Sequence, residues 1–203
     1  MRVEVPESHK MLDAAARSDL SRLKRGRSGR PCQSCTVRCD RCGSLSCRCN
    51  CAPSCEMAPR MLSSEPERFP IEPGIVPLVY AMAELGAVET IWSCEGHLSP
   101  DRKRLWKTPQ IWFCCRTPGV AGLLTFALAG IRKHLTCGDW QVRLAPLGPK
   151  GSTVYVMEPF VGGDAPDLLP ALQADVEKIA GMFPDTLKKL AGEALDEQAG
   201  KPA

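Results

Sequence analysis

Ile75-Val-Pro-Leu-Val-Tyr-Ala-Met-Ala-Glu-Leu85, followed after Gly86 by Val88-Glu-Thr-Ile-Trp-Ser93, is the stretch that decides the fold. The first part is apolar and alanine-rich and ends at a glycine, which predicts a buried helix. Pro77 is tolerated because it falls in the first turn. The second part alternates and carries β-branched and aromatic residues, which predicts a strand. A helix therefore leads directly into a strand.

The same kinds of element follow towards the C-terminus. Further strands are predicted at Gln110–Arg116, Asp139–Leu144 and Ser152–Met157, and further helices at Gly119–Leu135 and Asp167–Ala194, the last broken near Pro184. The order helix–strand–strand therefore occurs twice before the final helix. This order predicts an α+β fold in which two αββ units form one mainly antiparallel sheet with helices on one face.

Composition shifts divide the chain into four regions. An N-terminal helix at 7–25 ends at Gly26, and four prolines fall between Ala58 and Pro73. We therefore predict a helix and basic loop at 1–30, a cysteine-rich metal-binding segment at 31–57, a linker at 58–73 and the α+β domain with its helical tail at 74–203.

Eight of the twelve cysteines lie within one short segment. Their order is Cys32-x2-Cys35-x3-Cys39-x2-Cys42, then Cys47-x-Cys49-x-Cys51-x3-Cys55. Four thiolates complete a tetrahedral zinc site, so eight predict about two Zn²⁺ ions per chain. The segment has almost no side chains for a core, so metal binding would have to stabilise it. Its thiolate-dense second half resembles metallothioneins.

Two other interpretations of these cysteines remain open. An iron–sulfur cluster also uses cysteine thiolates, although the spacing differs from that of bacterial ferredoxins. Disulfides suit secreted domains, but the first ten residues show no apolar core of a signal peptide. We therefore expect a cytoplasmic protein in which the cysteines bind metal.

The charge of the chain is unevenly distributed. Residues 1–60 carry 12 Lys/Arg against 6 Asp/Glu, whereas the whole chain has a net charge of +3. A basic N-terminal third favours nucleic acid, with RNA as the expected partner, or an anionic small molecule. The arginines interleaved with the cysteines could equally neutralise the thiolates. The longest apolar run, 120–131, is too short to span a membrane, so we expect no membrane association.

A second group of chemically active residues follows the first predicted strand. Cys94, Glu95 and His97 lie in a turn that contains Gly96, and a glycine there permits a sharp change of direction. If this turn offers them to one cavity, His97 would be a base or ligand, Cys94 a nucleophile or ligand, and Glu95 an acceptor for the imidazole or a ligand. We expect Arg116 and the basic loop 102–107 along its rim.

The motif Thr90-x2-Ser93-Cys94-x-Gly96, between an apolar helix and a second strand, resembles the Ser-Cys-x-Gly turn of the tRNA wybutosine-synthesis methyltransferases. The similarity covers roughly 30 residues and differs from that family at Trp92, Glu95 and His97. In the family the turn lies at a catalytic site, and S-adenosylmethionine is the methyl donor. The resemblance thus implies a related fold and S-adenosylmethionine as a cofactor.

Two classes of function agree with these patterns. In the first, Cys94, Glu95 and His97, with Arg116, form the site of a metal-dependent or RNA-modifying enzyme, and the cysteine segment is a binding module. In the second, the chain is a non-catalytic metal-binding interaction or regulatory protein. Metal binding is common to both, and the sequence leaves catalysis undecided.

Overall fold

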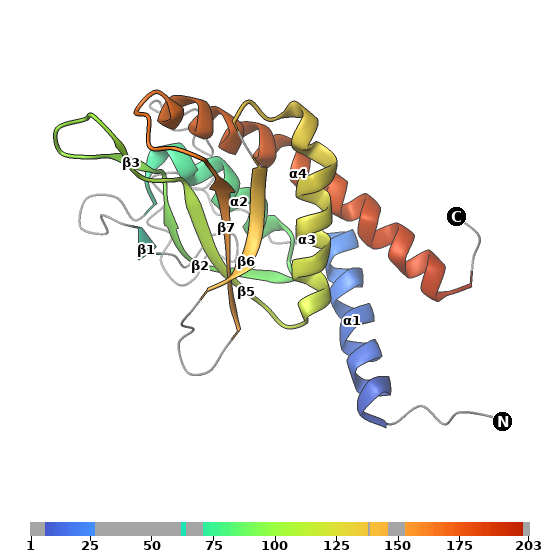
Figure 1. Ribbon diagram of the computed structural model, residues 1–203. Coiled ribbons are helices and arrows are strands. Elements are labelled where there is room, and N and C mark those ends of the chain that lie inside the picture. The colour runs from blue at the N-terminus through green and yellow to red at the C-terminus, as the bar shows by residue number, and fades with distance from the viewer. Residues whose placement is uncertain (1–6, 27–61, 64–70, 138, 146–152, 201–203) are drawn as a thin grey trace, which may run out of the picture.

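A five-stranded sheet lies at the centre of the computed structural model (Figure 1), which describes residues 7–26, 62–63, 71–137, 139–145 and 153–200. The strands follow the order β1 (Leu62–Ser63), β2 (Val88–Cys94), β5 (Gln110–Cys115), β7 (Val154–Phe160) and β6 (Asp139–Leu144). Strand β1 pairs with β2 in parallel, and all other neighbours are antiparallel. The predicted metal-binding segment from Cys32 to Cys55 lies outside the described residues, as do the predicted boundaries at 30 and 57.

The helices complete two αββ units, as predicted. Helix α2 (Val76–Glu84) precedes the β2–β5 pair, and α3 (Pro118–Ile131) precedes the β6–β7 pair. The two pairs join through β5 and β7, so the four main strands form one antiparallel sheet. Helix α1 (Glu7–Arg25) at the N-terminus and α4 (Leu168–Gln198) complete the mixed α+β fold. The predicted fold class is confirmed.

The hydrophobic core lies on one face of this sheet, beneath the helices. Ile111 and Phe113 of β5 pair with Met157 and Tyr155 of β7, so all four side chains point to the same face. Phe113 stacks on Tyr155 with ring centroids 5.7 Å apart. These residues belong to one buried cluster with apolar side chains from all four helices. The alternation of the strands therefore determines which face the helices cover.

Helix α4 runs through Pro184 without a break, so the break expected there is wrong. A proline inside a helix removes one backbone hydrogen bond and costs about 3 kcal/mol. Phe183 and Leu187, one on each side, are completely buried, and their packing outweighs that cost. Figure 1 shows α4 changing direction along its length, as a proline kink would produce.

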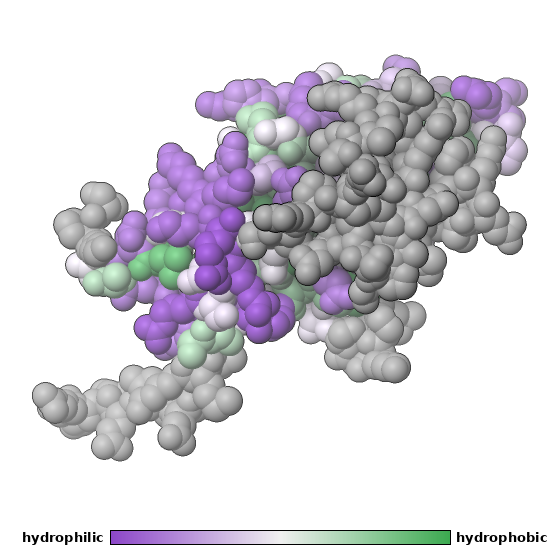
Figure 2. Space-filling model, turned by 180° about the vertical axis from the view of Figure 1, so that it is seen from behind, coloured by the Kyte–Doolittle hydropathy of each residue, from purple (hydrophilic) through white to green (hydrophobic). Residues whose placement is uncertain are grey.

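The helical end of the molecule is polar on its outer surface. Seen from behind, the described surface over α1 and the C-terminal half of α4 is mostly hydrophilic (Figure 2). Among the described residues, no helix combines the length and apolar character that crossing a membrane requires.

A second, two-stranded sheet projects from the end of β2. Strand β3 (His97–Leu98) pairs antiparallel with β4 (Leu105–Lys107), and Figure 1 shows the loop between them extending away from the main sheet. We call residues 97–107 the β3–β4 arm. The sequence predicted only a basic loop at 102–107 here, because strands of two or three residues are too short to show a periodic pattern.

Candidate metal centre

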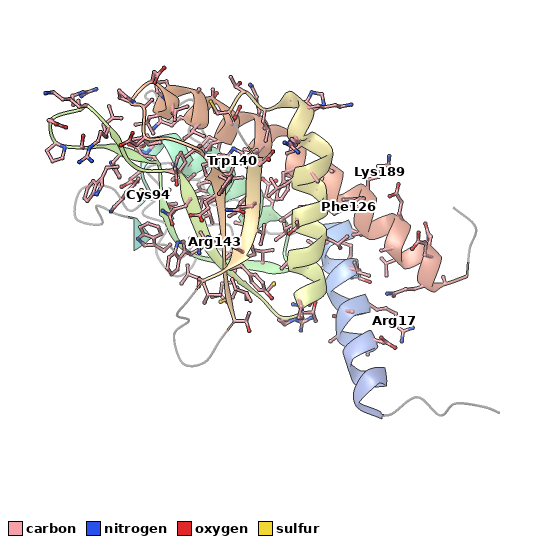
Figure 3. All side chains as sticks on the ribbon, viewed as in Figure 1. Arg17, Cys94, Phe126, Trp140, Arg143 and Lys189 are labelled. Atoms are coloured by element: carbon pink, nitrogen blue, oxygen red, sulfur yellow. The ribbon has the colours of Figure 1, made fainter. Side chains whose placement is uncertain are left out.

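The C-terminal end of β2 positions the first candidate ligand. Cys94 is the last residue of the strand and is completely buried. In Figure 3 it lies at the same end of the sheet as the β3–β4 arm. The Gly96 N–H donates a hydrogen bond to Cys94 Sγ over 3.4 Å. The turn that follows the strand therefore holds the sulfur in a defined position.

Gly96 makes that turn possible. Its φ of +86° is in the region that residues with a side chain rarely adopt. A Cβ at this position would lie 2.7 Å from Leu169 Cδ1 and 2.9 Å from Pro109 Cδ. Both the backbone conformation and the available space thus require glycine. The turn brings His97 back towards Cys94.

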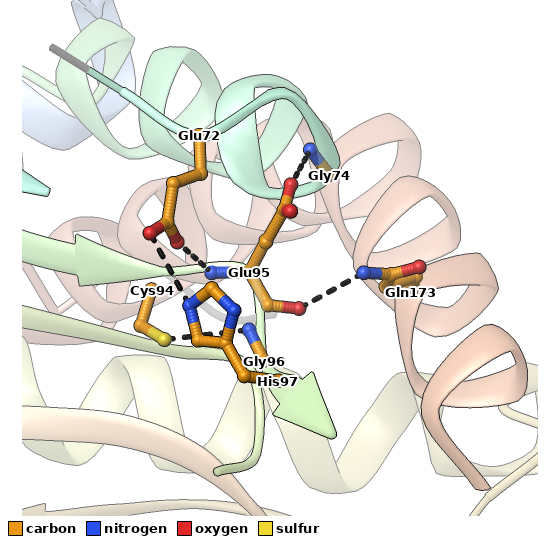
Figure 4. Close-up of polar contacts among 7 residues, drawn as sticks. All are labelled: Glu72, Gly74, Cys94, Glu95, Gly96, His97 and Gln173. Atoms are coloured by element: carbon orange, nitrogen blue, oxygen red, sulfur yellow. Dashed lines mark hydrogen bonds and ion pairs between the residues drawn. The ribbon is translucent and has the colours of Figure 1, made fainter. Parts of the chain in front are cut away.

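Glu72 contributes the third candidate ligand from a segment predicted to be a linker. It immediately precedes the short 3-10 helix η2 (Pro73–Ile75), and its side chain is only 1% exposed. Glu72, Cys94 and His97 each offer one ligand atom, and these atoms all lie within 4.8 Å of one another (Figure 4). The structure therefore brings together a Glu/Cys/His group with the composition of a metal site.

The expected proximity of Cys94 and His97 is confirmed, but Glu95 does not join them. Its carboxylate turns away and accepts a hydrogen bond from the Gly74 N–H at 2.6 Å, as Figure 4 shows. Neighbouring residues at a strand end point to opposite sides, so Cys94 and Glu95 diverge. Glu72 takes the place beside the imidazole that we expected for Glu95.

Backbone contacts of Glu95 still support the group. The Glu95 N–H donates to Glu72 Oε2 at 2.7 Å, and Gln173 Nε2 donates to the Glu95 carbonyl at 3.2 Å. Hydrogen bonds from outside a metal site orient its ligands and commonly change metal affinity by about 10- to 100-fold. Glu95 therefore acts here by positioning Glu72.

Arg116 lies at the other end of the hairpin. The β2–β5 register places Cys94 opposite Gln110 and Val88 opposite Cys115, so the residue after Cys115 is remote from the turn. Arg116 instead contacts the buried carboxylate of Asp19 in α1. The structure does not bring Arg116 to the candidate centre. The basic loop 102–107, in contrast, lies in the arm that begins at His97.

A contact between Glu72 and His97 lies at the centre of this group. His97 Nε2 lies 3.3 Å from Glu72 Oε1, which is ion-pair distance; both atoms are buried, and neither makes a hydrogen bond within the described part of the chain. A buried polar atom without a partner typically costs about 1–3 kcal/mol, and a charged one costs more. The Glu72 oxygen and the His97 nitrogen could therefore each bind a further partner, and both lie close to the Cys94 sulfur.

Comparison of the chain with protein-family models, with curated proteins and with solved structures finds no match. The argument about function therefore depends on the site itself.

Proposed function

We propose that Glu72, Cys94 and His97 bind a Zn²⁺ ion and that this chain is a zinc-binding protein with its metal centre in the α+β domain. The observation that carries the proposal is the convergence beside Cys94 of two buried atoms, Glu72 Oε1 and His97 Nε2, which contact each other and make no hydrogen bond among the described residues. A cation among the three would satisfy both atoms at once. Buried charges in proteins are usually paired or bind metal for this reason.

The spacing of the ligand atoms supports zinc. Nitrogen and oxygen ligands at about 2.0–2.1 Å around a tetrahedral Zn²⁺ lie about 3.3 Å apart. The Glu72–His97 distance is 3.3 Å. The Cys94 sulfur lies within 4.8 Å, and a tetrahedral sulfur–nitrogen edge of about 3.6 Å would need a shift of little more than about 1 Å. One thiolate, one imidazole and one carboxylate form a donor set that suits zinc.

Three protein ligands favour an open metal site. Structural zinc sites have four protein ligands, whereas catalytic sites keep one position for water or substrate. Within the described part of the chain, the group contains no fourth Cys, His, Asp or Glu. His97 is 23% exposed while Glu72 is 1% exposed, so a fourth ligand would enter from the His97 side. Such a centre could activate water or polarise a carbonyl or phosphoryl oxygen.

The test compares the zinc content of matched variants of the full chain, purified without oxygen. Because the segment from Cys32 to Cys55 is itself predicted to bind zinc, the informative quantity is the difference from the parent. Glu72→Gln, Cys94→Ala and His97→Gln should each bind one zinc ion fewer. His134→Gln and Cys137→Ser change the same residue types outside the group and should keep the parent content.

Equal zinc content in the parent and all three site variants, each folded by circular dichroism, would falsify the proposal. The absorption spectrum of the same anaerobic samples separates zinc from an iron–sulfur cluster, because only the cluster absorbs visible light. Iron in place of zinc at this group would also contradict it.

A further inference from the structure

The β3–β4 arm begins at the candidate metal centre. His97, the imidazole of the Glu/Cys/His group, is also the first residue of β3 and pairs with Lys107 of β4. The arm and the candidate centre therefore share His97. Figure 1 shows its loop projecting beyond the main sheet.

The arm presents a concentrated positive charge. It carries Arg102, Lys103, Arg104 and Lys107 against a single acid, Asp101. The first three are exposed, and among the described residues none of the four forms an ion pair. Cations that lack internal partners remain available to an anion.

The one carboxylate of the arm is used internally. Asp101 Oδ1 accepts hydrogen bonds from Ser99 Oγ at 2.5 Å and from the Lys103 N–H at 3.2 Å. These two bonds lower the pKa of Asp101. The charge of Arg104 adds to this effect, but Asp101 forms no ion pair within the arm.

An aromatic side chain lies among these cations. Trp106 is 64% exposed, and Lys107 Nζ is 4.7 Å from the centroid of its ring. The ammonium group covers part of the ring by a cation–π contact, and the exposed remainder offers a flat surface. Cations beside an exposed aromatic ring are the combination that binds single-stranded nucleic acids, through phosphates and stacked bases.

Hydrogen bonds within the arm fix its shape. Ser99 accepts from the Arg102 N–H at 2.7 Å and from the Arg104 N–H at 3.1 Å, and its own N–H donates to the Arg104 carbonyl at 2.9 Å. At the base, Leu105 is buried and its N–H donates to the Asp164 carbonyl at 2.6 Å. A preformed arm loses little conformational entropy on binding.

We propose that the arm binds single-stranded nucleic acid, with phosphates on Arg102, Lys103, Arg104 and Lys107 and one base stacked on Trp106. Bases in a duplex are already stacked on one another, so a protruding tryptophan favours unpaired strands. A lipid surface would meet only one exposed large apolar side chain in the arm, Trp106. Binding of nucleic acid to the arm does not depend on the proposed zinc function. The further step, that nucleic acid is the substrate class of the metal centre, rests on that proposed function.

The test measures binding of the full chain to fluorescent single strands of about 12 nucleotides, RNA and DNA, by anisotropy at several salt concentrations. Trp106→Ala should weaken binding by roughly 5- to 150-fold, the loss expected for one stacked base, with an unchanged salt slope. Arg102→Gln/Lys103→Gln/Arg104→Gln should reduce the salt slope by about 0.7 for each lost phosphate contact.

The matched control is Lys188→Gln/Lys189→Gln on α4, since Figure 3 shows Lys189 at the opposite end of the molecule from Cys94. This control should bind like the parent. Parent-like binding by both arm variants would overturn the inference and would assign any affinity to the basic N-terminal third. Equal or tighter binding to a duplex of the same length, to polyglutamate or to anionic vesicles would also overturn it.

The two proposals fail separately. If Glu72→Gln loses no zinc but Trp106→Ala loses binding, the metal proposal is wrong and the arm proposal holds. If zinc content follows the Glu/Cys/His group but binding is independent of Trp106, only the arm proposal is wrong.

Discussion

The Oε1 atom of Glu72 lies 3.3 Å from Nε2 of His97, and neither atom makes a hydrogen bond with any other described residue. The other oxygen of the same carboxylate accepts from the Glu95 N–H at 2.7 Å, so the side chain is held in place. One oxygen of the carboxylate is thus held by the backbone, and the other faces the imidazole. The cation proposed above would give both the second oxygen and the imidazole nitrogen a further partner.

The first prediction concerns Glu72→Gln, which preserves shape and removes the charge. One zinc ion per chain should be lost, while the metal-free protein should become more stable, by on the order of 1 kcal/mol. The reason is that a buried charge disappears and the new amide can donate to His97 Nε2. Chemical denaturation in the presence of a chelator measures the free energy of unfolding of the metal-free protein. Glu84→Gln, at an exposed position, is the control. A loss of metal-free stability would contradict it.

The second prediction concerns Gly96. Gly96→Ala should destabilise the domain by about 1–3 kcal/mol and reduce zinc binding, because φ is +86° and the new Cβ would lie 2.7 Å from Leu169 Cδ1. Gly122→Ala is the matched control. Nothing lies within 4 Å of a Cβ there, so it should stabilise α3 by about 0.5–1 kcal/mol. The measurements are denaturant unfolding and zinc content, and equal effects at both glycines would contradict the argument.

Local patterns were enough to predict the helices and strands of the two αββ units. Gly86 ends one apolar helix and Val88 begins a strand, and the same transition recurs before Trp140, so periodicity identified both αββ units. The pairing of β5 with β7 joins those units and depends on packing of Phe113 and Tyr155, which no local pattern reveals. Similarly, packing of Phe183 overrides the helix break predicted at Pro184.

The candidate site was predicted only in part, because one ligand comes from a distant segment. Cys94 and His97 are close in sequence, so their proximity follows from the turn at Gly96. Glu72 lies 23 residues before Glu95 in a proline-rich stretch, which read as a linker. A usable signal was present: proline is favoured at the first position of a helix, so Pro73 marks a helix start and places Glu72 directly before it.

Other predictions from the sequence remain untested. Zinc or iron–sulfur binding by the cysteines from Cys32 to Cys55 concerns residues outside those described. The prediction of S-adenosylmethionine as a cofactor depends only on the resemblance around Thr90 and Cys94.

The separation of Arg116 from the turn has a simple cause: in an antiparallel hairpin the end of one strand lies beside the start of the other.

The third prediction separates Arg116 from the metal centre. Arg116 and Thr117 both donate hydrogen bonds to Asp19, which is 1% exposed and belongs to α1. Arg116→Ala should therefore lower stability by about 1–3 kcal/mol, because it removes a charged partner of a buried carboxylate, and should leave zinc content unchanged. Arg132→Ala, whose ion pair with Asp139 is exposed, should cost at most about 1 kcal/mol. If the Arg116→Ala variant is folded but binds less zinc than the parent, this prediction is wrong and Arg116 belongs to the candidate centre.

The last prediction concerns alkaline pH. Burial raises the pKa of the Cys115 thiol from 9.0 to about 11, and the nearby Cys114 and Asp19 add to this effect. The unfolded chain therefore loses this proton at lower pH than the folded chain does. The contribution of Cys115 to the free energy of unfolding should be constant below pH 9 and should fall between about pH 9 and 11.

Cys115→Ala isolates this effect, since it removes the titrating thiol and leaves the other ionisable groups in place. Denaturant unfolding of the parent and the variant from pH 7 to 11 gives the difference in stability at each pH. Tyr155 also has a pKa raised by burial, and its effect is common to both proteins, apart from a smaller contribution from Cys115. The parent should lose stability relative to the variant only above about pH 9. A difference that stays constant across the range would mean that the folded protein does not hold this thiol in its neutral form.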